Sequence, residues 1–173
     1  MTVPMPQAQN KRPVASCYDV ALTQLGRRDF SCAELHRRLL EKGFEEKEAA
    51  ETIARLLDAR YLDDARYAKA VVRTRAQLSG WGVQRIRLDL KKRLIPSAVI
   101  QQALADYEEQ ILTQEDGAED WADKATDLLT RKYGRWSGTL EQKDYAKRLG
   151  FLMRRGYSFD QAKQALEATR DDL

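Results

Sequence analysis

The stretch at residues 36–53 reads HRRLLEKGFEEKEAAETI, and its pattern returns as RLDLKKRLIPSAVIQQAL at 87–104 and as LGFLMRRGYSFDQAKQAL at 149–166. Five aligned positions share their chemistry: Leu39, Leu90 and Leu152; Lys42, Arg93 and Arg155; Phe44, Ile95 and Tyr157; Ala49, Ile100 and Ala162; Ile53, Leu104 and Leu166. In each copy the pattern predicts a helix that ends in a basic residue, followed by a turn, a bulky apolar residue and a second helix. Recurrence at offsets of 51 and 62 residues is typical of a helical array, which offers a long surface rather than a pocket.

The repeat predicts an all-α fold, an elongated array of three tandem three-helix units of helix-turn-helix type. We expect residues 1–15, which hold three of the four prolines, to form a disordered tail. Repeat 1 then covers residues 16–60, the basic repeat 2 covers residues 61–109, and repeat 3 covers residues 110–173 with an acidic joint at its start. Because each unit is small, we expect each repeat to close a modest core of its own.

Local signals indicate where helices start and which side chains they bury. Ser31 and Glu34 have the spacing of a capping box, and Asp63 and Asp64 precede a helix whose free amides they can cap. The apolar spacing predicts buried faces. Their members include Leu35, Leu39, Leu56, Leu57, Val71, Leu78, Ile86, Leu90, Leu129, Leu152, Phe159 and Leu166.

Charge is nearly balanced over the chain, at a net +3, but it is strongly segregated. Residues 66–93 hold nine cations and one acid, residues 106–127 hold nine acids and one cation, and residues 131–155 hold eight cations and two acids. A chain that separates its charges in this way presents basic surfaces despite a small net charge.

Two interpretations of the basic run are open: a solvated helix face, or a surface that binds a large anionic partner. The run has almost no acids for internal ion pairs, and arginine, which suits phosphate and carboxylate groups, outnumbers lysine six to three. The candidate interface consists of Arg66, Lys69, Arg73, Arg75, Arg85, Arg87, Lys91, Lys92 and Arg93, with Arg154 and Arg155 in the third repeat. For Trp81, stacking on a base, anchoring an interface and burial between repeats all stay open.

Catalysis and metal binding have little support in the sequence. The single histidine, His36, lies on an amphipathic helix, and with Cys17 and Cys32 it cannot supply a zinc site of the usual composition. There is no Gly-rich phosphate loop and no nucleophile elbow. We therefore expect no enzyme activity, no metal and no cofactor. The absence of a membrane-spanning apolar run and of a signal core predicts a soluble, cytoplasmic protein with reduced thiols.

The chain resembles the RecX family, the bacterial regulators of the RecA recombinase, over about residues 18–169. The resemblance is carried by Ser31-Cys-Ala-Glu-Leu35 with Lys42-Gly43-Phe44, by Tyr61-Leu-Asp-Asp-Ala-Arg-Tyr-Ala68, by Gly82-Val-Gln-Arg-Ile86 with Ile95, and by Arg154-Arg-Gly-Tyr-Ser-Phe159. The chain departs from the family at Arg60 and at Leu94, where a turn often carries glycine, so the geometry of these two turns is in question.

The resemblance implies a non-enzymatic regulator of recombination, DNA repair and the SOS response. Such proteins bind the RecA filament on single-stranded DNA, lie along its groove and depress ATP hydrolysis, strand exchange and co-protease function. We expect the chain to be a monomer that touches DNA weakly or within the filament. The alternative is a stand-alone helix-turn-helix DNA-binding protein, for single- or double-stranded DNA, that affects RecA by competition for DNA.

Overall fold

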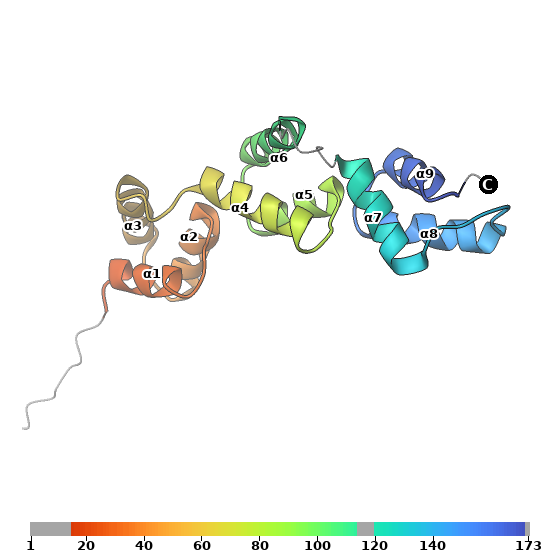
Figure 1. The fold of residues 1–173 in the computed structure, drawn as a ribbon. Helices are drawn as coiled ribbons and strands as arrows, with labels where there is room; N and C mark the ends of the chain where they lie inside the picture. The colour runs from red at the N-terminus through yellow and green to blue at the C-terminus, as the bar shows by residue number, and fades with distance from the viewer. Residues whose placement is uncertain (1–14, 114–119, 172–173) are drawn as a thin grey trace, which may run out of the picture.

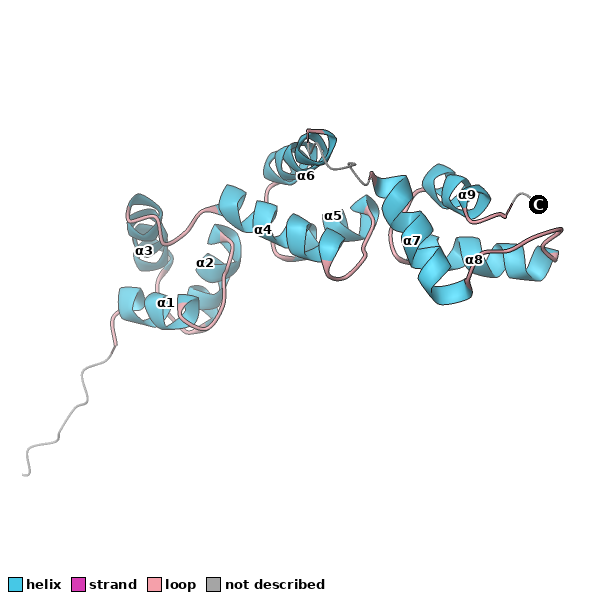
Figure 2. Cartoon of the chain, in the orientation of Figure 1, coloured by secondary structure: helices cyan, strands magenta, loops and turns pink. Residues whose placement is uncertain are grey.

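The computed structural model describes residues 15–113 and 120–171, and within these ranges its regular elements are helices (Figure 2). Their bounds are α1 Cys17–Leu25, α2 Cys32–Glu41, α3 Glu46–Asp58, α4 Asp64–Gln77, α5 Val83–Lys92, α6 Ser97–Leu112, α7 Trp121–Tyr133, α8 Gln142–Arg154 and α9 Phe159–Ala168. The predicted disordered tail lies, apart from Ala15, outside the described residues. In the described ranges no helix is long and apolar enough to cross a lipid bilayer.

The helices form three successive groups along an extended molecule, α1–α3, α4–α6 and α7–α9 (Figure 1). We refer to these groups as repeats 1, 2 and 3. In every group the first helix packs against the third: α1 on α3, α4 on α6 and α7 on α9. The C-terminal end of the molecule lies opposite repeat 1. The predicted all-α array of three tandem three-helix repeats is confirmed.

The buried side chains form two clusters rather than one for each repeat. The first belongs to repeat 1 and includes Leu35, Leu39 and Leu56. The second runs through repeats 2 and 3 without a break. It passes from α6 to α7 through the rings of Tyr107 and Trp121, whose centroids lie 5.5 Å apart. The prediction of a separate core for each repeat is therefore wrong for repeats 2 and 3, because aromatic side chains bridge the joint between them.

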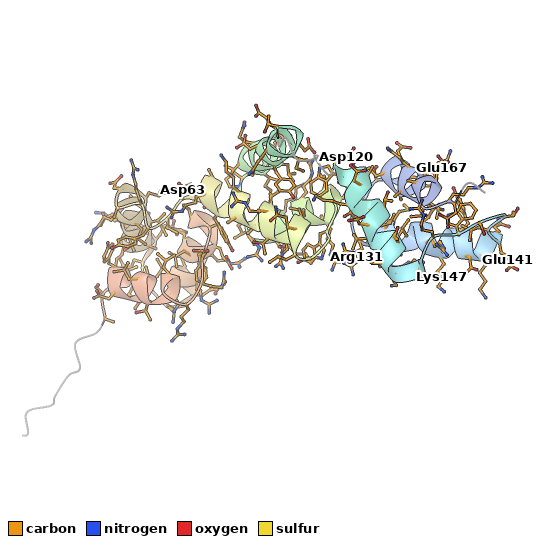
Figure 3. All side chains as sticks on the ribbon, viewed as in Figure 1. Asp63, Asp120, Arg131, Glu141, Lys147 and Glu167 are labelled. Carbon is orange, nitrogen blue, oxygen red and sulfur yellow. The ribbon has the colours of Figure 1, made fainter. Side chains whose placement is uncertain are left out.

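Side-chain caps begin helices where the sequence predicts them. The Ser31 hydroxyl accepts a hydrogen bond from the Glu34 amide at 3.0 Å. The Asp63 carboxylate, labelled at the start of α4 in Figure 3, accepts one from the Arg66 amide at 2.9 Å. The Glu34 carboxylate, however, binds Arg28 at 2.7 Å instead of reaching back to Ser31. Only half of the predicted capping box is present, because an arginine competes for the carboxylate.

Three apolar side chains that the spacing assigns to the core are exposed. Leu57 is 44%, Leu78 is 84% and Phe159 is 54% exposed. On α4 the buried side chains include Val72 and Ala76. The buried face is therefore rotated by about one residue position from the face that the spacing predicted. Packing of α4 against α6 determines which side of the helix is covered, and periodicity alone does not contain that information.

Several turns after helices place a residue in the left-handed region, with or without glycine. Gly43 and Gly156 have φ values of 91° and 92° after α2 and α8. Leu94 occupies the matching turn after α5 and Arg60 the turn after α3, and both have a φ of 59°. A non-glycine residue in this left-handed region costs roughly 1–2 kcal/mol. At the two positions where the sequence left the turn geometry in question, the backbone is therefore left-handed and strained.

Candidate functional site

The second helices of the three repeats are joined end to end. The hydroxyl of Ser31, the N-cap of α2, donates a hydrogen bond to the carbonyl of Arg93, the C-cap of α5. In the same way, the amide of Gly82 at the start of α5 donates to the carbonyl of Arg155 after α8, at 2.8 Å. The positive end of one helix dipole thus faces the negative end of the next, which is favourable. The same type of junction occurs twice and aligns the repeats.

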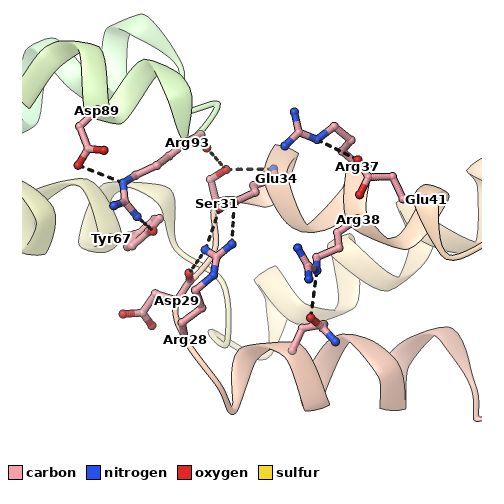
Figure 4. Close-up of polar contacts among 11 residues, drawn as sticks. Arg28, Asp29, Ser31, Glu34, Arg37, Arg38, Glu41, Tyr67, Asp89 and Arg93 are labelled. Atoms are coloured by element: carbon pink, nitrogen blue, oxygen red, sulfur yellow. Dashed lines mark hydrogen bonds and ion pairs between the residues drawn. The ribbon is translucent and has the colours of Figure 1, made fainter.

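A polar cluster closes the junction between repeats 1 and 2 (Figure 4). The Arg93 guanidinium lies 3.3 Å from the Asp89 carboxylate and donates to the Tyr67 hydroxyl. Across the same junction the Cys32 amide donates to the Asp64 carboxylate at 2.8 Å. Burial opposes the charge of Arg93, but its interactions with Tyr67 and Asp89 outweigh this and raise its pKa. The Arg93 side chain therefore links α5 to α4 within repeat 2, beside the junction that its backbone carbonyl forms with Ser31. The sequence did not reveal this role.

At the junction between repeats 2 and 3 the two backbones lie in close contact. A Cβ atom on Gly82 would lie 2.5 Å from the backbone of Gly156, which is closer than any side chain can approach. The Arg155 guanidinium reaches back across this junction and donates to the carbonyl of Ser79 at 2.8 Å. The Arg155 side chain is therefore occupied by a contact between repeats.

The eleven predicted interface cations fall into two groups. Five of them make a contact within the molecule or are partly buried. Besides Arg93 and Arg155, the exposed Lys69 pairs with Asp106 at 2.7 Å and Arg75 pairs with Asp89 at 3.1 Å, while Arg87 is half-buried. The hydrogen bond from Lys69 lowers the pKa of Asp106. The charges of Lys69, Arg75 and Arg93 are thus paired with acids, and Arg155 donates to a backbone carbonyl.

The remaining six cations are exposed and, among the described residues, have no acidic side chain within ion-pair distance. They are Arg66, Arg73, Arg85, Lys91, Lys92 and Arg154. Arg66 and Arg73 line a shallow groove of about 450 Å³ along α4. Arg85 and Lys92 of α5 line a second groove together with Arg154 of α8. The junction thus brings uncompensated charge from repeats 2 and 3 to one place, although these residues are far apart in the sequence.

The groove between α5 and α8 also contains apolar side chains that the sequence analysis did not single out. Its volume is about 380 Å³, and Leu88 and Met153 lie in its lining, 59% and 50% exposed. Leu88 falls between Ile86 and Leu90 on the side of α5 that does not face the core. Leu88 could have been identified from the sequence, because it is an apolar residue on the side of an amphipathic helix opposite its buried face.

Trp81 lies at the edge of the same groove and is partly buried against the core of repeats 2 and 3. The guanidinium carbons of Arg75 and Arg85 lie 4.6 Å and 4.2 Å from its ring centroid, a distance at which cation–π attraction is effective. Of the interpretations left open above, burial between repeats is closest to the observed position.

Among the described residues no cluster of three or more histidine, cysteine or acidic side chains could hold a metal ion. His36 lies 3.2 Å from Glu46, on the surface of repeat 1. The two cysteines are free, Cys17 buried and Cys32 partly buried.

The Cys32 thiol should be unreactive in the folded protein. Burial, with the neighbouring Asp64 charge, raises the pKa of this thiol from its ordinary value near 9 to about 12. The thiol of the unfolded chain ionises first, so the stability from this group is complete below about pH 9 and is lost as the pH rises towards 12. We expect alkylation of Cys32 at pH 8, followed by peptide mapping, to be at least about 100-fold slower in the native protein than in urea. Equal rates in the two states would contradict the buried, protonated thiol.

Comparison with protein families assigns each repeat. The models described as the first, second and third three-helix domains of RecX match residues 17–56, 63–104 and 118–166. The matched segments contain the second helices α2, α5 and α8 in full and both junctions between them, while α3, α6 and α9 extend beyond the matches.

Characterised relatives and solved structures show the same similarity. The chain is 37% identical to the regulatory protein RecX of Vibrio parahaemolyticus, over 95% of this chain and 98% of the relative. It is 37% identical to that of Xanthomonas axonopodis pv. citri, over 88% and 85%. The crystal structure of RecX from Lactobacillus salivarius matches with a TM-score of 0.72 and 23% identity, over 88% of this chain and 94% of that one. At that level of identity the structural match shows the shared fold.

Proposed function

Because this chain belongs to the RecX family of regulatory proteins, we propose that it binds the RecA filament on single-stranded DNA and inhibits its ATPase, strand-exchange and co-protease activities. It acts as a monomer in the cytoplasm, in the regulation of recombination and DNA repair, and carries out no chemistry of its own. The observation that supports this proposal most directly is the set of six uncompensated cations spread over two rigidly joined repeats.

The extended array suits a partner that is itself a repeating assembly. Three repeats joined end to end can contact successive filament subunits at once, and linked contacts bind far more tightly than separate ones. Exposed arginine and lysine side chains attract acidic protein surfaces and DNA phosphates, which raises the rate of association. A regulator that binds one filament state more tightly than the others shifts the filament towards that state. Inhibition of ATP hydrolysis then follows without any active site.

A second candidate function is competition with RecA for DNA. The exposed Arg66 and Arg73 beside α4, in a helix-turn-helix-like unit, favour phosphate contacts of the kind that give sequence-independent DNA binding. In that case inhibition would follow from coverage of the DNA, and the filament protein would contribute no contact.

Titration of DNA-dependent ATP hydrolysis by the cognate RecA tests the proposal. We expect hydrolysis to fall as this protein is added, and we expect binding to the filament to be at least about tenfold tighter than binding to naked single-stranded DNA. Inhibition well below one chain per RecA subunit would indicate capping of filament ends, and stoichiometric inhibition would indicate coating of the groove.

The salt dependence separates the two candidate functions. Binding to naked DNA as tight as binding to the filament, with a steep decrease at rising salt, would support competition. A RecA ATPase that is unchanged by an excess of the protein would contradict both functions.

A further inference from the structure

The groove between α5 and α8 combines an apolar floor with a cationic rim. Leu88 and Met153 are about half exposed, although neighbouring leucines on the same two helices, Leu90 and Leu152, are fully buried. Arg85, Lys92 and Arg154 line the groove with them, and so does one acid, Asp89, which pairs with Arg75 and Arg93. An exposed apolar centre enclosed by charged side chains is the arrangement of a protein-binding hot spot, in which the rim excludes water from the centre.

We propose that this groove binds a short segment of the filament protein in which a bulky apolar side chain lies next to acidic residues. The apolar side chain packs on Leu88 and Met153, and the acidic residues pair with Arg85, Lys92 and Arg154. This inference rests on the proposed function and names the part of the partner that one site recognises. Charge complementarity supports it, because the described residues supply no acidic partner for these three cations.

The shape of the groove matches a segment rather than a domain. A volume of about 380 Å³ lies near the lower end of the range of roughly 300–1,000 Å³ typical of ligand sites. The two walls come from different repeats, which meet at the close contact of Gly82 with Gly156. Since both walls are in place without a partner, the segment binds a site that is already formed, which reduces the entropy lost on binding. Methionine, with its flexible side chain, adapts to the shape of an apolar partner.

The same observations disfavour a nucleic-acid base as the occupant. Base binding generally uses an exposed aromatic ring as a stacking platform. The aromatic ring in this groove belongs to Trp81, and the guanidinium groups of Arg75 and Arg85 already lie over it. What the groove leaves exposed is aliphatic and thioether surface, which favours contact with an apolar side chain.

The test replaces both floor residues, as Leu88→Ser with Met153→Ser, and measures inhibition of the cognate RecA ATPase on single-stranded DNA. We expect the half-inhibitory concentration to rise at least about tenfold while filter binding of naked single-stranded DNA stays unchanged. The matched control is Leu57→Ser with Phe159→Ser, which removes two equally exposed apolar side chains outside the groove and should inhibit like the wild type. The pair Leu88→Met with Met153→Leu, which keeps the floor apolar, should also retain inhibition.

The outcomes separate this inference from the proposed function. If the wild type inhibits and the serine pair inhibits equally, the groove assignment is overturned and the proposed function stands. If the serine pair loses naked-DNA binding in parallel with inhibition, the groove binds nucleic acid and the segment is excluded. If the wild type fails to inhibit, the proposed function itself is wrong. Circular dichroism and thermal melting verify folding, and the single Leu88→Ser variant carries the same comparison should the pair melt early.

Discussion

Replacing Gly156 with alanine should destabilise the protein by about 3 kcal/mol, whereas the same change at Gly43 should cost only about 1 kcal/mol. Both glycines have a φ near 90°, so the backbone strain of an alanine in the left-handed region is the same at either position. Only at Gly156 would the new Cβ collide with another repeat, 2.4 Å from the amide nitrogen of Arg85. At Gly43 it would meet nothing within 4 Å. The difference between the two variants therefore measures the closure of the junction.

Gly82→Ala isolates the collision from the strain. Gly82 has a φ of −79°, which any residue adopts, yet its Cβ would lie 2.5 Å from the Gly156 carbonyl. We expect a loss of about 2 kcal/mol, read from urea unfolding by circular dichroism. Equal losses for Gly156→Ala and Gly43→Ala, together with a neutral Gly82→Ala, would show that repeats 2 and 3 do not stay in contact in solution.

The array could be predicted from the sequence because its information is carried by side chains at regular spacing. Buried positions such as Leu39, Leu90 and Leu152 repeat in each copy, since every repeat must cover its second helix. The junctions left no such pattern, because the hydrogen bonds that join the ends of the second helices go to backbone carbonyls, which every residue possesses. Gly82 was the residue that marked one of these junctions in the sequence. Its backbone conformation suits any residue, so the glycine is needed for the close contact and not for its own φ.

The basic residue that recurs before the turn does not have the same role in each repeat. The helices that end at Arg93 and Arg155 both meet another repeat at a junction. Both side chains have a partner: Arg93 pairs with Asp89 in its own repeat, and Arg155 donates across the junction to Ser79. Lys42 occupies the same column, but α2 ends at the free side of repeat 1 and the side chain is exposed. Three aligned cations therefore have two different roles. The distinction depends on which helix end meets another repeat, and a single sequence does not supply this.

Reversal of Arg73, Lys92 and Arg154 to glutamate should raise the concentration needed for half-inhibition of the RecA ATPase by about 100-fold. All three side chains are exposed, and within the described chain none pairs with an acid, so reversal breaks no internal ion pair. At a complementary interface each reversed charge costs about 1 kcal/mol, and about 3 kcal/mol in total corresponds to a factor of about 100. Arg93 is left unchanged, because its reversal would break its contacts with Asp89 and Tyr67 inside repeat 2.

The matched control reverses Arg27, Lys42 and Lys47, three exposed cations of repeat 1. Each reversal changes the charge by −2, so both triple variants move the net charge from +3 to −3. We expect the control to inhibit within about threefold of the wild type, since long-range attraction is screened beyond roughly 10 Å at 0.1 M salt. A similar loss in both variants would mean that net charge, rather than a defined surface, drives binding. Full inhibition by the first variant would show that the basic surface of repeats 2 and 3 is not part of the interface. These exposed cations would then belong to solvated helix faces.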